Sequence, residues 1–215
     1  MRIARATSEH LNIILGLIDE AAEWLRLKGL DQWAQPWPDR EKRDARILKG
    51  LEGEKTWIVW HRDTPAATVT MATQHNPEVW SRPACECDLD ESAVYAHRLI
   101  TARNYAGWGL GAELIDWAGL RAQREYGAKW VRIDVWTKNR ALHGYYKKRG
   151  FVPCGTCADA AYPSGALFQK PVAAITAPPS PLFAESPPHR DATASYESVV
   201  SWLSSSRLGI LSIPA

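Results

Sequence analysis

The chain has 215 residues, a length that fits one domain with a small appendage, and 46% of them are hydrophobic, enough to build a core. It carries 26 basic and 24 acidic residues without a basic stripe, which argues against binding nucleic acid through bulk charge. No apolar run reaches the ~18 residues expected of a membrane span. The N-terminus also lacks the apolar core of a secretory signal, so we expect a cytoplasmic protein with no membrane contact.

The first half of the chain predicts strands and helices in alternation. Residues 2–6 read as a strand, and Thr7 or Ser8 can cap a helix that runs to about Lys28. After a tryptophan-containing loop at 31–38, residues 39–51 show a helical pattern. Two β-prone runs, 56–61 and 68–73, flank a turn signal and predict a hairpin, which a polar loop at 76–91 follows.

The second half predicts a strand at 94–101, a glycine-rich turn, a helix to about 126 and a strand at 129–136. Asn139 is a good cap for a helix at 141–149, Gly150 is its expected stop, and two closing strands follow at 151–154 and 166–169. Residues 172–215 are rich in proline, serine and alanine. We therefore expect a domain at 1–171 and a disordered tail at 172–215, with one possible short helix around 196–203.

The four cysteines form two close pairs, Cys85-x-Cys87 and Cys154-x-x-Cys157. Two such pairs can mark a zinc site, although the first spacing is tight for a zinc hairpin. In a cytosolic protein we expect reduced thiols instead, and no metal.

The glycine turn at 107–111 is the most informative segment, because a strand, a glycine turn and a helix start together direct backbone N–H groups at an anion such as phosphate. A P-loop is excluded, since Ala112 and Glu113 stand where lysine and serine or threonine are required. Gly107-x-Gly109-x-x-Ala112 formally matches the dinucleotide fingerprint, and Asp134 stands where the ribose-binding acid is expected. The order of elements does not continue a parallel βαβ series, which weakens this NAD(P)-binding Rossmann alternative.

Together with Asn139, Tyr146 and Gly150-Phe151, the turn resembles that of the GNAT superfamily of acyl-CoA-dependent N-acyltransferases. The element order fits this family over residues 1–171. The resemblance implies a mixed α+β fold, with a central twisted, mostly antiparallel mixed sheet flanked by helices. Ala106 departs from the family pattern, which has arginine or glutamine at this position, so one side-chain contact to the pyrophosphate is missing; Arg103 is a candidate to compensate.

The resemblance implies acetyl-CoA as the acyl donor and no metal. The backbone N–H groups expected to hold its pyrophosphate are those of Gly107, Trp108, Gly109, Leu110, Gly111 and Ala112. The remaining residues expected to bind the donor are Leu99 and Thr101, which would pair with the pantetheine amides as an extra strand would, Arg103, Asn139 and Tyr146.

For the chemistry, Tyr146 is the expected general acid that protonates the departing thiolate. His97 is the candidate base for the amine, and Asp134 or a water chain are alternatives. Trp33 and Trp37 are expected in an aromatic-walled site for a small-molecule or peptide amine, in a monomer or homodimer. The sequence therefore predicts an N-acetyltransferase, with a non-catalytic acyl-CoA-binding or sensor protein as the alternative.

Overall fold

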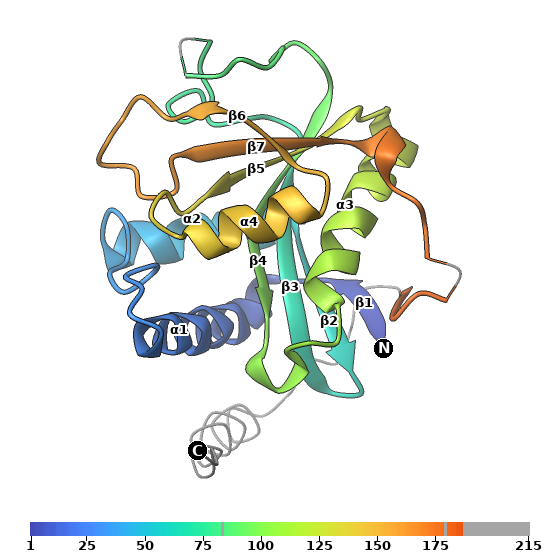
Figure 1. Cartoon of the computed structure of the whole chain (residues 1–215). Coiled ribbons are helices and arrows are strands. Elements are labelled where there is room, and N and C mark those ends of the chain that lie inside the picture. The colour runs from blue at the N-terminus through green and yellow to red at the C-terminus, as the bar shows by residue number, and fades with distance from the viewer. Residues whose placement is uncertain (83, 179, 187–215) are drawn as a thin grey trace, which may run out of the picture.

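The computed structural model describes residues 1–82, 84–178 and 180–186, which fold around one eight-stranded sheet (Figure 1). The strands lie in the order β6-β7-β5-β4-β3-β2-β1-β8. Neighbours are antiparallel except for the pairs β4–β5 and β1–β8, which are parallel. The strands are β1 (Arg2–Arg5), β2 (Thr56–His61), β3 (Thr64–Ala72), β4 (Ala93–Thr101), β5 (Trp130–Val135), β6 (Val152–Thr156), β7 (Ala166–Pro171) and β8 (Ala184–Glu185).

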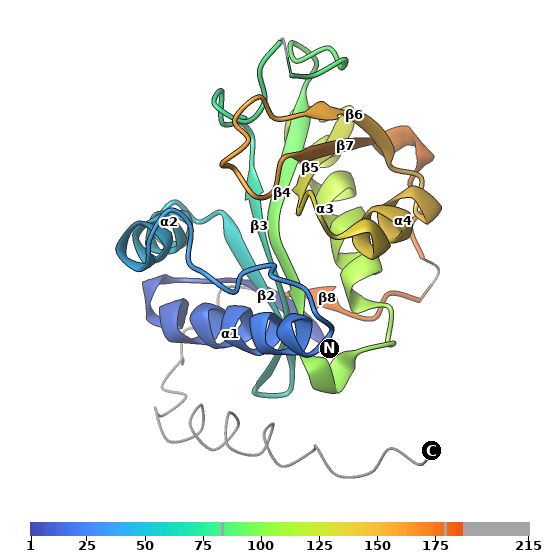
Figure 2. The same ribbon diagram turned by 60° about the vertical axis from the view of Figure 1, so that its left-hand side comes forward.

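Helices cover both faces of this sheet (Figure 2). α1 and α2 lie on one side, and α3 and α4 lie on the other. The α-helices are α1 (Leu11–Leu27), α2 (Arg40–Glu52), α3 (Leu110–Tyr126) and α4 (Arg140–Lys148); short 3-10 turns are η1 (Ser8–His10), η2 (Arg103–Tyr105) and η3 (Val172–Ala174). The mixed α+β fold with a mostly antiparallel sheet is thus confirmed, and the parallel, doubly wound sheet of the NAD(P)-binding alternative is absent from the described residues.

Local capping residues set the helix ends; the sequence predicts the cap at Asn139 but not the one at Asp39. The side chain of Asp39 accepts a hydrogen bond from the N–H of Lys42 at 2.8 Å and begins α2. Asn139 does the same for the N–H of Leu142 at 3.0 Å and begins α4. Gly127, with φ of 71°, ends α3 in the left-handed conformation that glycine adopts without steric cost.

The β2–β3 hairpin is tighter than expected. β3 begins at Thr64, directly after a turn at Arg62, whose φ is 56°. The sequence predicts a longer connection between residues 61 and 68, because Pro65 is a turn signal. The partner of Pro65 in the register is Trp60, at a shift in the pairing between Val59 and Trp60, where the ladder tolerates a residue without an N–H group.

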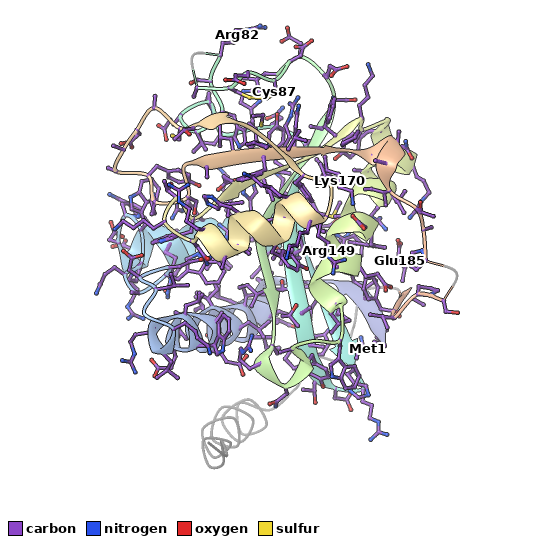
Figure 3. The ribbon with its side chains drawn as sticks, viewed as in Figure 1. Met1, Arg82, Cys87, Arg149, Lys170 and Glu185 are labelled. Atoms are coloured by element: carbon purple, nitrogen blue, oxygen red, sulfur yellow. A yellow bond between two sulfur atoms is a disulfide. The ribbon has the colours of Figure 1, made fainter. Side chains whose placement is uncertain are left out.

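The chain continues to pack against the domain beyond the expected boundary at residue 171. β8 pairs in parallel with β1, and Phe183 is buried in the main core with Val172 and Ile175. Glu185, seen beside α3 in Figure 3, accepts a hydrogen bond from the indole N–H of Trp117 at 2.9 Å. Residues 172–178 and 180–186 therefore belong to the packed structure, whereas the helix expected around 196–203 lies outside the described residues.

No helix in the described parts of the chain has the length and apolar character needed to cross a membrane.

Candidate functional site

The central strands β4 and β5 part in the middle of the sheet. They pair over three residues each, Ala93–Tyr95 with 130–132, and no pairing continues between them in the described chain. The far side of β4 stays paired with β3 as far as Thr101. The backbone of β4 beyond Tyr95, including Leu99 and Thr101, therefore faces an opening that an extended ligand can fill as an additional strand.

A bulge interrupts β4 beside this opening. Thr68 pairs with Ile100 and Thr70 with His97, so two residues of β4, Arg98 and Leu99, lie opposite one residue of β3. Arg98 has a φ of 50°, in the left-handed region. The regular alternation of side chains along a strand is therefore broken at Arg98.

The glycine turn follows the end of β4 and supplies free amides. Gly107 and Gly109 have φ of 84° and 82°, conformations in which a side chain would be strained. In the described chain, the N–H groups of four residues donate to no protein group: Gly107, Gly109, Leu110 and Gly111. These four amides, at the N-terminus of α3, form a cradle suited to an anion.

Two of the six expected cradle amides are already used within the chain. The N–H of Trp108 donates to the carbonyl of Tyr105 at 3.3 Å, and that of Ala112 donates to the carbonyl of Gly109 at 3.0 Å. The Trp108 side chain is exposed beside the rings of His61 and Tyr105.

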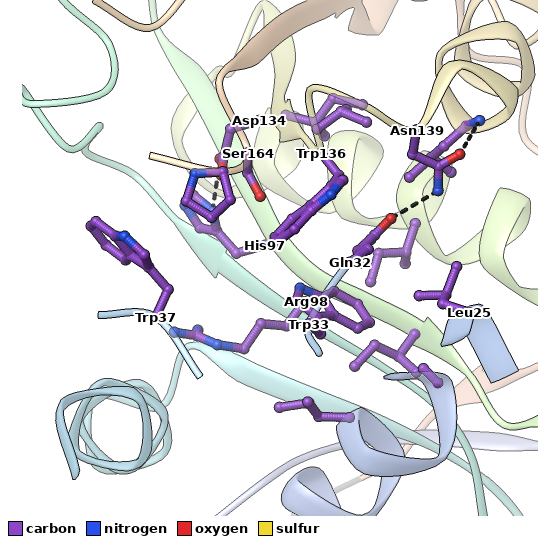
Figure 4. Close-up of a pocket in the computed structure, with 18 of the residues that line it drawn as sticks. Leu25, Gln32, Trp33, Trp37, His97, Arg98, Asp134, Trp136, Asn139 and Ser164 are labelled. Carbon is purple, nitrogen blue, oxygen red and sulfur yellow. Dashed lines mark hydrogen bonds and ion pairs between the residues drawn. The ribbon is translucent and has the colours of Figure 1, made fainter. Parts of the chain in front are cut away.

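A cavity of about 1000 Å³ lies along the opening between β4 and β5. Its wall contains residues of α1, α2, the loop between them, β4, β5 and α4. The loop before β4 contributes Asn76, Val79 and Trp80. Trp33 and Trp37, from the loop between α1 and α2, line this cavity (Figure 4).

His97, Asp134 and Tyr162 lie together in the cavity wall, joined by one ion pair and one hydrogen bond, and we call them the Asp134 cluster. The Nδ1 atom of His97 lies 3.1 Å from Oδ1 of Asp134, and the Tyr162 hydroxyl donates to Oδ2 at 2.6 Å. Burial by itself would raise the pKa of Asp134, but the charge of His97 and the hydrogen bonds from His97 and Tyr162 outweigh it, so the pKa lies below its ordinary value. Asp134 is thus a carboxylate that orients His97.

The sequence does not predict that Tyr162 belongs to this site. It lies in the loop between β6 and β7, and its ring packs edge-on against Trp37 at 5.1 Å. Burial, together with the charge of Asp134, raises the pKa of Tyr162, so its hydroxyl remains a proton donor. No pattern in the sequence marks this residue, because the contact with Asp134 spans 28 positions.

Tyr146 lies on α4 and lines the same cavity. Its ring packs against Tyr145 and Phe151, and the residue is 8% exposed. Burial, and then the neighbouring charges, raise the pKa of Tyr146 above its usual range. Its hydroxyl therefore keeps its proton at neutral pH, which is the state that a general acid requires.

Asn139 is held by a partner that the sequence did not reveal. Its side-chain Nδ2 donates to Oε1 of Gln32 at 2.8 Å, and both residues are buried (Figure 4). In the same loop, Asp31 accepts hydrogen bonds from Trp136 at 2.9 Å and Lys138 at 3.0 Å. These contacts tie the loop between α1 and α2 to the start of α4. Asn139 thus caps α4 and anchors the loop.

Arg103 lies near the start of the glycine turn but has a partner of its own. Its guanidinium lies over the ring of Trp24, 4.0 Å from the ring centroid, and its backbone N–H donates to Glu20 at 3.0 Å. Ala106 is exposed and leaves the cradle without the side-chain contact that arginine or glutamine would give.

The two cysteine pairs meet in one small core cluster away from the main core. Cys85 and Cys87 form a disulfide, so the expectation of reduced thiols is wrong for this pair. One sulfur atom from each of Cys85, Cys87 and Cys154 lies within 4.8 Å of the others, and Cys157 is buried in the same cluster. Figure 3 shows Cys87 beside β6.

A Cβ atom on Gly155 would lie 1.9 Å from the Ala84 carbonyl oxygen, so the close approach of the loop before β4 to β6 requires glycine.

Comparisons with known proteins agree with this geometry. Residues 17–151 match the model of the "Acetyltransferase (GNAT) family". The chain is 30% identical over 169 residues to the "Uncharacterized N-acetyltransferase YesJ" of Bacillus subtilis (strain 168), covering 79% of this chain and 89% of that protein.

Solved structures share the fold. A GNAT-family acetyltransferase from Listeria monocytogenes 4b F2365 superposes with a TM-score of 0.62 at 20% identity, over 79% of this chain and 93% of that chain. The PaiA N-acetyltransferase from Thermoplasma acidophilum, solved in complex with coenzyme A, gives a TM-score of 0.53 at 14% identity, over 79% and 98%. On the family match and the sequence relative, this chain is an acetyltransferase and belongs to the GNAT family.

Proposed function

We propose that the protein transfers an acetyl group from acetyl-CoA to a primary amine by direct attack in a ternary complex. The observation that carries this proposal is the combination of the parted strands β4 and β5 with the four free amides of the glycine turn at the end of β4. A pantetheine arm has peptide-like amides that suit an open strand edge, and a pyrophosphate suits a helix N-terminus. The PaiA relative with coenzyme A shows that a protein of this fold holds such a ligand.

Bound acetyl-CoA supplies the thioester carbonyl carbon, which exchanges its C–S bond for a new C–N bond. The Nδ1 atom of His97 faces Asp134, so Nε2 is the nitrogen left to accept the proton of the amine. The Tyr146 hydroxyl gives a proton to the thiolate. A backbone N–H of β4 near Leu99 or Thr101 stabilises the oxyanion.

Direct attack requires both substrates in one cavity at the same time. The cavity runs from Thr101, near the glycine turn, to Trp37 and Tyr162, and its volume of about 1000 Å³ leaves room for an acceptor beside a pantetheine arm. Ala106 removes a side-chain contact from the cradle, so the free amides carry most of the affinity for the pyrophosphate.

A thermal-shift titration with acetyl-CoA, longer acyl-CoAs and NAD, followed by measurement of CoA release over a panel of amines, tests this function. We expect acyl-CoA, and not NAD, to raise the melting temperature, because a ligand that binds the folded state alone stabilises it. Release of CoA with at least one amine would exclude the non-catalytic acyl-CoA-binding alternative. Stabilisation without release from any amine would contradict the proposed reaction.

A further inference from the structure

Arg98 is a cationic side chain in the cavity that the acyl-transfer steps leave unused. Successive residues of a regular strand point to opposite faces of a sheet. Because of the bulge and the φ of 50°, Arg98 nevertheless lines the same cavity as its neighbour His97. Figure 4 shows its side chain extending across the cavity towards Trp37. The bulge thus places Arg98 in the wall of the same cavity as the imidazole that we propose as the base.

A second guanidinium stands at this end of the cavity. Arg46, on α2, lies over the ring of Trp37 at 5.1 Å and donates a hydrogen bond to its carbonyl oxygen. Among the described residues, neither Arg98 nor Arg46 has a carboxylate within ion-pair distance. Burial, and then the charge of Arg46, lower the pKa of Arg98 to about 10, so Arg98 is still protonated at neutral pH.

Some of the other charged groups of this wall have carboxylate partners, whereas Lys28, Arg103 and Arg140 line the cavity without an ion pair among the described residues. Arg43 lies 2.7 Å from Asp44 and 3.7 Å from Asp19, and Lys138 lies 3.0 Å from Asp31. Among the described residues, the carboxylate that lines the cavity is that of Asp134. It already contacts His97 and Tyr162. The guanidinium groups of Arg98 and Arg46 therefore add positive charge at the end of the cavity that Trp37 lines.

We propose that Arg98, assisted by Arg46, binds a carboxylate of the acceptor, and that the acceptor is an amino acid or a similar small amine bearing a carboxylate. This inference rests on the proposed function. A guanidinium offers parallel N–H groups that match a carboxylate. Because His97 and Arg98 line the same cavity, one acceptor can present its amine to the imidazole and its carboxylate to the guanidinium. A polyamine would instead bring like charge to the two arginines.

The charge is not needed for the phosphates of the donor. The free amides that suit the pyrophosphate belong to residues 107–111, beyond the end of β4, whereas Arg98 lies inside the strand. Arg98 is therefore positioned to select the acceptor and not to bind the donor.

The test uses the full chain and paired acceptors that differ in one group: amino acids, the corresponding amino acid amides, and spermidine as a cationic amine. We expect kcat/KM for the amino acids to exceed that for their amides by about tenfold or more, as loss of a hydrogen bond between charged groups predicts. Arg98→Gln should raise KM for the amino acid by a similar factor, leave the KM for acetyl-CoA unchanged and remove the preference over the amide.

Arg26→Gln is the matched control, because Arg26 is exposed on α1 and pairs with Glu23 away from the cavity. Preference for the amide or for spermidine, or an equal effect of Arg98→Gln on both members of a pair, would overturn the inference. A rise in KM for acetyl-CoA alone would assign Arg98 to the donor. Failure of the proposed function looks different: acetyl-CoA would then give no thermal stabilisation and no amine would release CoA.

Discussion

The Nδ1 atom of His97 lies 3.1 Å from the Oδ1 atom of Asp134, at the point where β4 and β5 have separated. The two residues come from adjacent strands, but they lie beyond the last residue pair that joins those strands. The contact therefore bridges the opening in the sheet. It also sets the orientation of the His97 ring, with Nε2 as the nitrogen free for proton transfer.

Asp134→Asn is expected to lower kcat/KM by about 10²-fold, within the range usual for general acid–base contributions. The neutral amide leaves the imidazolium that forms during amine deprotonation without its carboxylate partner. His97→Ala should remove the acidic limb of the pH–rate profile of kcat/KM. Asp90→Asn, at an exposed residue paired with Arg82, is the control. An unchanged profile in both variants would show that water takes the amine proton.

Asp134 should also contribute to stability in a pH-dependent way. Its pKa is lower in the folded protein than in the unfolded chain, so its stabilising contribution is present above about pH 4 and is lost as the pH falls through the folded pKa. Urea unfolding of the wild type and Asp134→Asn between pH 6 and pH 3 measures this. The stability difference should narrow at the acidic end; a difference that is constant over this range would refute the assignment.

Tyr146→Phe is expected to retain affinity for acetyl-CoA and to lower kcat by about 10²-fold, because the thiolate loses its proton donor. Calorimetric titration with CoA and steady-state turnover separate the two effects. Tyr126→Phe removes the same hydroxyl from a partly exposed residue at the end of α3, and it should leave both quantities unchanged. Equal turnover of the wild type and Tyr146→Phe would remove Tyr146 from the mechanism.

The raised pKa of the Tyr146 hydroxyl also predicts how kcat depends on pH in alkaline solution. Its pKa is raised above the ordinary value of 10 by burial, so the proton is retained as the pH rises through 9 and 10. Deprotonation of Tyr146 therefore contributes no loss of kcat in this interval, which the alkaline half of the same pH–rate profile checks.

Gly109→Ala is expected to weaken CoA binding and to destabilise the fold by about 1–2 kcal/mol, because a side chain is strained at a φ of 82°. Gly144→Ala is the opposite case. Gly144 lies in α4 with nothing within 4 Å of an added Cβ, so alanine should stabilise the helix by about 0.5–1 kcal/mol. Denaturant unfolding and CoA titration of both variants compare the two sites. Similar CoA affinity of Gly109→Ala and wild type would argue against the amide cradle.

The parts of the fold that depend on local sequence were predictable. Asn139 and Gly127 act on the turn of helix next to them, and alternating apolar residues mark the central strands. The glycine turn was equally predictable, although the sequence did not show which of its amides are already used within the chain.

The rest depends on contacts between distant residues. Tyr162 reaches Asp134 from a loop, and Gln32 reaches Asn139 across 107 positions. β8 has two residues, too few to show a periodicity, and exists through its pairing with β1. The bulge at Arg98 reverses the side-chain direction that simple alternation assigns, so its place in the cavity was visible only in three dimensions.

Because the two halves of the sheet are joined by a short ladder, we expect the bound donor to make the junction between them more rigid. Three residue pairs between β4 and β5 are the backbone ladder that joins the half formed by β5, β6 and β7 to the half formed by β1–β4 and β8. A ligand bound along the open edge of β4 would add contacts between the two halves of the sheet. Amide hydrogens of β4 beyond Tyr95 and of β5 beyond Arg132 should then exchange more slowly when CoA is bound, while those of the hairpin β2–β3 should not change.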